Sequence, residues 1–155
     1  MISLKQLIST NKWELKGLKI GLKAKNLAWM AKNDYMDQIP PFFVITPEEC
    51  ERIMDKGVFP DLGSFIKKIG SNKNPQYLFV RSSAQLEDEV GIPTAGLFLS
   101  LAKITKEQLK EAIVRVIRST KEENVKKVLG FTPTTAIIIQ EMISCSCSGV
   151  LFTIQ

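Results

Sequence analysis

Residues 77–83 read YLFVRSS, a run of strand-forming residues that ends in a cation and two hydroxyl groups. Aromatic and β-branched residues favour a pleated, half-buried surface, so the run predicts a buried strand over residues 77–80. Arg81 then marks the end of that strand, with Ser82 and Ser83 after it. Residues 136–143, which read AIIIQEMI, predict a second buried strand. We therefore expect a sheet that presents polar groups where its strands end.

Helix signals lie on the N-terminal side of these strands. Apolar residues recur at helical spacing over residues 24–33, and the Gly17 to Gly21 segment predicts a loop that leads into this helix. Residues 42–45 predict a short buried strand. Thr46 with Glu49 forms a capping box, so a helix should begin there and stop near Gly57. A shorter helix should follow and end at Gly70.

The C-terminal half adds a second capping box, from Thr105 to Gln108, and helical spacing from there to about Ser119, with further helix to Leu129. Residues 149–153 predict a strand that would form an antiparallel hairpin with residues 136–143. Together these elements predict an α+β fold with a mixed or antiparallel sheet and packed helices.

The chain of 155 residues has 21 Lys and Arg, 16 Asp and Glu, a net charge of +5 and no histidine. Without histidine, these residues cannot form a Ser-His-Asp or Cys-His pair, a histidine general base or a phosphohistidine. The modest positive charge suits a polyanion such as a nucleotide. The basic residues are spread out and lack an aromatic pattern for base stacking, so we expect no nucleic-acid partner.

Three cysteines, Cys50, Cys145 and Cys147, form an odd set with one Cys-x-Cys pair, which argues against a secreted disulfide framework. The pair could hold a soft metal, but two ordinary residues beside a strand is the simpler interpretation, and we predict no metal site. The sequence has no apolar run of about 18 residues and no signal-peptide core. We therefore expect a cytoplasmic protein without a membrane partner.

Five segments resemble the nucleotide-binding domain of phosphoenolpyruvate synthases and pyruvate phosphate dikinases. In chain order they are GLKAKNLA at 21–28, IPPFFVIT at 39–46, VRSSA at 80–84 with Glu87-Asp88 and Ala95-Gly96 after it, IIQEMI at 138–143, and SGVLFT at 148–153. They follow the order of the family's motifs over about residues 15–153. Each motif alone is weak, and the five in register make the resemblance specific.

The resemblance implies that residues 1–155 are the N-terminal part, the first lobe, of an ATP-grasp nucleotide-binding domain. In this family ATP lies between two lobes and phosphorylates a histidine on a separate swivelling domain, which passes the phosphoryl group to an acceptor such as pyruvate. The chain has no histidine, and it stops directly after an apolar strand. We therefore expect a truncated chain that needs the remaining domains, with the carboxylates that hold Mg²⁺ outside it and no catalytic residue or activity of its own.

The resemblance also implies an ATP site of eight residues: Lys23, Arg81, Thr94, Ala95, Gly96, Gln140, Met142 and Ile143. The first two would bind phosphate oxygens as a point charge and as a planar two-pronged donor. The Thr94-Ala95-Gly96 segment would cover the phosphates, and the last three residues would line the adenine. Each group has an alternative interpretation. Lys23 could be an ordinary solvated lysine, and Arg81 could pair with Glu87 or Asp88. Residues 94–96 could form an ordinary turn, and residues 137–143 could be a core strand.

Several positions depart from the family pattern. Leu22 and Ala24 replace the glycines that flank the family's lysine, so this segment is bulkier. Phe42 also replaces a glycine, and Leu97 and Leu99 replace polar residues. These departures leave a second hypothesis open, in which the chain is a truncated, non-catalytic homologue. Such a module would bind a nucleotide weakly or associate with itself as a homo-oligomer through an unpaired strand.

Overall fold

The computed structural model describes residues 1–9, 17–69, 77–85 and 96–147. Its centre is a five-stranded sheet in the order β1-β2-β5-β3-β4, and every neighbouring pair of strands is antiparallel. The strands are β1 (Ile2–Ser3), β2 (Phe42–Ile45), β3 (Leu78–Ala84), β4 (Ser100–Ile104) and β5 (Thr135–Glu141). The α+β class and the packed helices are confirmed, and the described sheet is wholly antiparallel rather than mixed.

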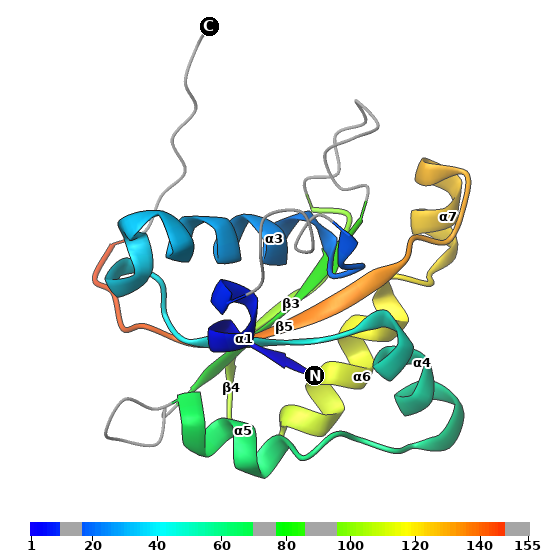
Figure 1. Cartoon of the computed structure of the whole chain (residues 1–155). Coiled ribbons are helices and arrows are strands. Elements are labelled where there is room, and N and C mark those ends of the chain that lie inside the picture. Colours follow the sequence, from blue (N-terminus) through cyan, green and yellow to red (C-terminus); the bar gives the residue numbers. More distant parts are fainter. Residues whose placement is uncertain (10–16, 70–76, 86–95, 148–155) are drawn as a thin grey trace, which may run out of the picture.

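Helices cover both faces of this sheet (Figure 1). They are α1 (Leu4–Ser9), α3 (Gly21–Met30) with the π-helical turn η1 (Ala31–Tyr35) and the 3-10 turn η2 (Met36–Gln38), α4 (Pro47–Lys56), α5 (Leu62–Ile69), α6 (Leu109–Ser119) and α7 (Glu123–Leu129). Helices α1 and α3 lie on one face, and α4, α5 and α6 lie on the other.

Alternate residues of the central strand β5 supply the two halves of the core. Ile137 and Ile139 are fully buried against the α4, α5 and α6 face, while Ala136 and Ile138 are fully buried against α1 and α3. Side chains alternate between the faces of a strand, so a strand covered on both sides must be apolar at successive positions. This requirement explains the unbroken AIII run at residues 136–139.

Local signals set the boundaries of β2 and α4 as predicted. Thr46 Oγ1 accepts a hydrogen bond from the Glu49 backbone N–H, and the Glu49 carboxylate accepts one from the Thr46 N–H at 2.9 Å, so the capping box is complete. The helix ends at Gly57, whose φ of +65° is the left-handed conformation of a helix terminus. The pKa of Glu48 is lowered by backbone and Thr46 hydrogen bonds in this first helical turn.

The sequence-based end of β3 was wrong. The strand does not stop at Val80 but continues through Ala84, because β5 pairs with it from Leu78 to Ala84 and β4 pairs with Arg81 through Ser100. Arg81 therefore lies in the middle of a strand rather than at its end. In the sequence these polar residues resemble a strand terminus, because the strands that pair with them, β4 and β5, are distant along the chain.

Residues 149–153, the predicted hairpin partner of residues 136–143, lie outside the described residues. The strand predicted over residues 136–143 is β5, which ends at Glu141 and pairs with β2 on one edge and with β3 on the other. Helix α6 begins at Leu109 rather than at Thr105. Gln108 Oε1 does accept a hydrogen bond from the Thr105 N–H at 3.1 Å, but the reciprocal bond of a capping box is not formed.

Strand β4, strand β1 and helix α1 were not predicted from the sequence. Gly70, the predicted end of α5, lies outside the described residues. The helix predicted to run on to Leu129 is interrupted at residues 120–122 and resumes as α7, which ends at Gly130 in the left-handed conformation. None of the helices in the described part of the chain is long and apolar enough to span a membrane.

Candidate nucleotide site

A cavity of about 490 Å³ opens between the C-terminal half of α3, the sheet face beneath it and the segment that follows β5. Twelve residues line it: Leu27, Met30, Gln38, Ile39, Pro40, Phe79, Arg81, Gln140, Glu141, Met142, Ile143 and Cys145. Four of the eight residues predicted for the ATP site are among them, namely Arg81, Gln140, Met142 and Ile143. Most of the remaining lining is apolar, as is usual for a ligand pocket.

Strand pairing explains why Arg81 reaches this cavity. Phe79 and Arg81 are two residues apart on β3, so they lie on the same face of the sheet, the face that α3 covers. The Arg81 guanidinium carbon lies 5.7 Å from the centre of the Phe79 ring, within cation–π range. The half-buried arginine is thus supported by an aromatic ring and keeps its planar donor group at the cavity wall.

Gln140 is opposite Phe79 across the β3–β5 ladder. Its side chain is only 7% exposed, and its Nε2 donates a hydrogen bond to the Pro40 carbonyl at 3.1 Å. This bond ties β5 to the segment that precedes β2. The amide therefore shapes the cavity wall, and one of its two N–H donors is already used by the protein.

Met142 and Ile143 follow β5 at the open end of the cavity. The Met142 backbone N–H donates to the Tyr77 carbonyl at 3.1 Å, and its sulfur accepts a hydrogen bond from the Lys103 N–H at 3.4 Å. Ile143 is 61% exposed. The two side chains give this end of the cavity an apolar lip.

Lys23 lies in the first turn of α3 and not in a loop before the helix, which corrects the prediction. The helix begins early because Ser83 Oγ accepts a hydrogen bond from the Ala24 backbone N–H at 3.1 Å and so caps the helix from a distant strand. Lys23 does not line the cavity. Ser83 follows Arg81 by two residues on the same face, about 7 Å along the strand, so the start of α3 lies beyond the Arg81 end of the cavity.

The two hydroxyl groups after Arg81 lie on opposite faces of the sheet. Ser83 caps α3, and Ser82 points to the other face, where its Oγ is fully buried and has no hydrogen-bond partner among the described residues. Gly96 is exposed with a φ of +79°, a conformation that suits glycine, but it does not line the cavity. Thr94 and Ala95 lie outside the described residues.

The apolar residues that form the walls of the cavity were not predicted from the sequence. Leu27, Met30 and Phe79 look like ordinary core positions, and only the packing of α3 over β3 brings them to Arg81. In the described part of the chain, no cluster of three or more Cys, Asp or Glu side chains could hold a metal ion. The prediction that Mg²⁺ ligands lie outside the chain therefore stays a prediction.

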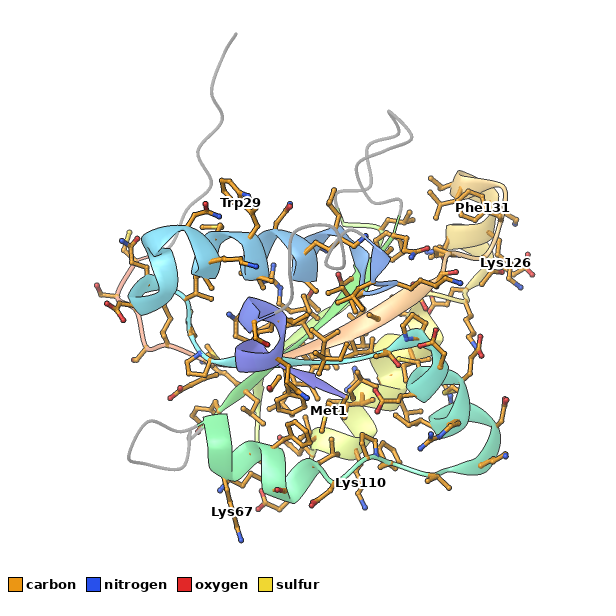
Figure 2. All side chains as sticks on the ribbon, in the orientation of Figure 1. Met1, Trp29, Lys67, Lys110, Lys126 and Phe131 are labelled. Carbon is orange, nitrogen blue, oxygen red and sulfur yellow. The ribbon has the colours of Figure 1, made fainter. Side chains whose placement is uncertain are left out.

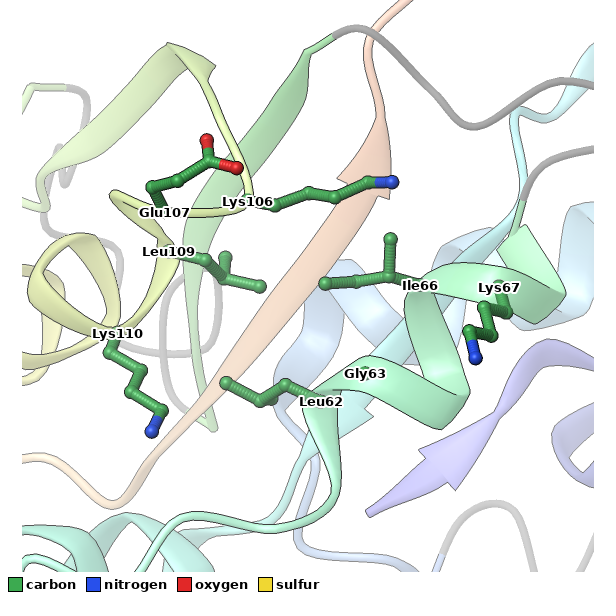
Figure 3. A pocket seen from close by; sticks show the side chains of 8 residues that line it. All are labelled: Leu62, Gly63, Ile66, Lys67, Lys106, Glu107, Leu109 and Lys110. Atoms are coloured by element: carbon green, nitrogen blue, oxygen red, sulfur yellow. The ribbon is translucent and has the colours of Figure 1, made fainter.

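A second cleft, of about 520 Å³, lies on the opposite side of the sheet between α5 and α6 (Figure 3). Leu62, Ile66 and Leu109 face one another across it, and lysines surround its rim. Lys67 and Lys110 lie on opposite sides of this apolar centre (Figure 3), on the side of the molecule away from α3 (Figure 2). This cleft lacks an arginine and contains none of the eight predicted residues, so it is a poorer candidate for a nucleotide.

The fold and the cavity define an α+β lobe whose pocket lies on one face of an antiparallel sheet and has mostly apolar walls, with one arginine, Arg81, and one carboxylate, Glu141. This arrangement is consistent with a nucleotide-binding domain of the ATP-grasp kind. Residues 56–155 match the family model of the pyruvate phosphate dikinase AMP/ATP-binding domain. The chain belongs to this family. No curated protein and no solved structure shows a significant match to the chain.

The family match includes Arg81 and the three predicted adenine-site residues, and it begins after Lys23. Membership in the family supports binding of ATP or AMP within a phosphotransferase of the pyruvate phosphate dikinase kind. The place of Lys23 in the site continues to rest on the resemblance of the GLKAKNLA segment alone.

Proposed function

We propose that the chain is the first lobe of the ATP-binding unit of a phosphotransferase, and that ATP occupies the cavity under α3. The observation that carries this proposal is the meeting of Arg81 with Gln140, Met142 and Ile143 in one cavity, although about 60 residues of chain separate the arginine from the others. A guanidinium beside an apolar slot provides both groups that an adenine nucleotide needs.

The geometry suggests an orientation for the nucleotide. Adenine would lie at the apolar lip made by Met142 and Ile143, and the phosphates would extend along β3 past Arg81. Beyond Arg81 lies the first turn of α3, whose N-terminal dipole and Lys23 favour negative charge. The bulkier Leu22 and Ala24 in this turn stand where the family has glycine, so contact with phosphate is less close there.

In the full reaction proposed here, a phosphoryl group passes from ATP to a histidine on another domain and then to an acceptor such as pyruvate. This chain has no histidine, so its own part is to bind and orient ATP. Mg²⁺ would be held by carboxylates of the second lobe. In the alternative, the chain is a non-catalytic module that binds nucleotide without passing on a phosphoryl group.

Calorimetric titration with ATP and with inorganic tripolyphosphate tests the binding proposal. The chain carries a net charge of +5, so any polyanion will be attracted at low salt. A pocket that also holds adenine should bind ATP at least about tenfold more tightly than tripolyphosphate, because burial of the adenine contributes roughly 1.4 kcal/mol to the binding free energy. Equal affinities, or no heat with either ligand, would contradict the proposal.

Thiol labelling tests where the nucleotide lies. Cys145 lines the cavity, whereas Cys147, two residues further along and also exposed, does not. We expect saturating ATP to slow the reaction of Cys145 with a maleimide severalfold and to leave Cys147 unchanged, as followed by mass spectrometry of the digested protein. Cys50 serves as an internal reference, because burial raises the pKa of its thiol to about 12 and makes it unreactive near neutral pH.

Protection of both exposed cysteines, or of neither, would argue against ATP in this cavity. Protection of both would point to a general change in the segment after β5, and protection of neither would place the nucleotide elsewhere. The Cys145→Ser variant assigns the protected signal, since it removes the one thiol that lines the cavity and keeps Cys147.

A further inference from the structure

The edge strand β4 has an irregularity opposite Phe79, one of the residues that line the cavity. Leu78 pairs with Ile104 and Val80 pairs with Leu101, so Ala102 and Lys103 together oppose the single residue Phe79. An extra residue of this kind is a β-bulge, which bends the strand and redirects its backbone groups. Bulges are frequent beside functional sites, and this one lies next to the cavity.

Lys103 adopts a left-handed backbone at this bulge, with a φ of +56°. It is the only residue other than glycine with a positive φ in the described part of the chain. A lysine is disfavoured in this conformation, because its Cβ crowds the following carbonyl oxygen. Such strain persists only where the surrounding structure holds it in place. Here the ladder pairs on both sides of the bulge, Leu78 with Ile104 and Val80 with Leu101, hold the backbone, and the Lys103 N–H donates a hydrogen bond to the Met142 sulfur at 3.4 Å.

The sheet order shows why a bulge is needed for this contact. β3 lies between β4 and β5, and neighbouring strands are about 4.8 Å apart, so Met142, directly after β5, is about 10 Å from β4. The Met142 backbone is fixed beside the start of β3 by its bond to the carbonyl of Tyr77, the residue that precedes the strand. Its side chain crosses the start of β3, and the bulge turns the Lys103 N–H toward the sulfur.

We propose that the bulge at Ala102 and Lys103 is a positioning device that holds the Met142 thioether at the cavity, and that Lys103 acts through its left-handed backbone rather than through its ammonium group. A methionine side chain has three rotatable bonds and adopts many shapes when it is free. Fixing the sulfur before the ligand arrives lowers the ordering cost of binding. The effect on ATP rests on the proposed function, whereas the effect on Met142 does not.

Two substitutions separate the backbone from the charge. Lys103→Gly removes the ammonium group and favours the left-handed conformation, whereas Lys103→Val removes the same charge and strongly disfavours it. The first readout uses the whole chain labelled with ¹³C at the methionine methyl groups, with the Met142 signal assigned through Met142→Leu. We expect the Met142 methyl signal to keep its position in Lys103→Gly and to shift and broaden toward the averaged value of a free methionine in Lys103→Val.

The second readout is ATP affinity by calorimetry. We expect Lys103→Gly to stay within about twofold of the wild type and Lys103→Val to bind roughly three- to tenfold more weakly, as for the loss of one ordered contact. Melting temperatures show whether each variant is folded. If Lys103→Val does not fold, Lys103→Ala gives the same comparison with a smaller conformational penalty and a smaller expected shift.

An unchanged Met142 signal in folded Lys103→Val or Lys103→Ala would overturn the proposal. It would also be overturned if Lys103→Gly disturbed Met142 as strongly as Lys103→Val, because the ammonium group would then be the acting part. If the wild type bound no ATP, the proposed function would fail, and the methyl spectra would still decide whether the bulge holds Met142.

Discussion

Replacing Gly21 by alanine is expected to destabilise the fold by at least about 3 kcal/mol, the largest effect of any single methyl group that we foresee. Gly21 begins α3 with a φ of +75°, and a Cβ at this position would fall far inside van der Waals contact with the carbonyl group and the hydroxyl of Ser83. The obstacle is strand backbone, which cannot move aside without disturbing β3. Urea unfolding followed by circular dichroism measures the loss of stability.

Gly57 and Gly130 provide matched controls for this substitution. Both have a left-handed backbone at a helix end, with φ of +65° and +78°, and neither has any atom within 4 Å of the Cβ that alanine would add. Gly57→Ala and Gly130→Ala should therefore cost only the conformational penalty of about 1–2 kcal/mol. If Gly21→Ala cost no more than these two, the close approach of α3 to Ser83 would not be required for the fold.

The tight contact at Gly21 also bears on the cavity. The Ala24 to Ser83 hydrogen bond and the absent Cβ at Gly21 together set how closely α3 packs on β3. Leu27 and Met30, further along the same helix, form the wall of the cavity that faces Arg81. A shift of α3 would therefore widen the proposed adenine slot. The GLKAKNLA segment thus shapes the cavity through the packing of α3, and a contact between Lys23 and phosphate stays a prediction.

Sequence signals predicted the elements whose causes lie within a few residues. The complete capping box at Thr46 and the glycine at position 57 define α4 without reference to the rest of the chain. Strand β4 shows the opposite case. It is an edge strand in which residues 102 and 103 are both exposed, and its bulge breaks the alternation of inward and outward residues that would have revealed it. Its existence depends on pairing with β3, which the sequence does not display.

The residues of the candidate site likewise fall into two groups, those that sequence motifs identify and those that only distant contacts place. Arg81 and Met142 belong to motifs that the resemblance identified, and the structure brings both to one cavity. Whether Lys23 lies in a loop or a helix was decided by the bond from the Ala24 N–H to Ser83, 59 residues beyond Ala24, so no local pattern could predict it. The Phe79 ring beneath the guanidinium was missed because a phenylalanine in a strand is ordinarily a core residue. Its role follows from the alternation of β3 and from the cover provided by α3.

Replacing Arg81 by lysine is expected to weaken ATP binding about tenfold to a hundredfold, even though the positive charge is kept. A guanidinium donates two parallel hydrogen bonds to a phosphate group, whereas an ammonium group is a point charge without that fork. Charge-assisted hydrogen bonds contribute roughly 1.5–3 kcal/mol each, which sets the size of the loss. Support from Phe79, 5.7 Å away, would also weaken, because lysine does not stack on a ring as a planar group does. Calorimetric titration of both proteins with ATP measures the change.

Arg118→Lys is the matched control, since it makes the same substitution at an exposed position of α6 on the other side of the sheet. It should leave ATP affinity unchanged and alter stability by no more than about 1 kcal/mol. The competing hypothesis, in which Arg81 pairs with Glu87 or Asp88, predicts a different pattern. There, Arg81→Lys would bind ATP as tightly as the wild type and would differ only by a small change in melting temperature. That result would separate the cavity under α3 from the nucleotide, because Arg81 is the one cationic side chain among the residues that line it.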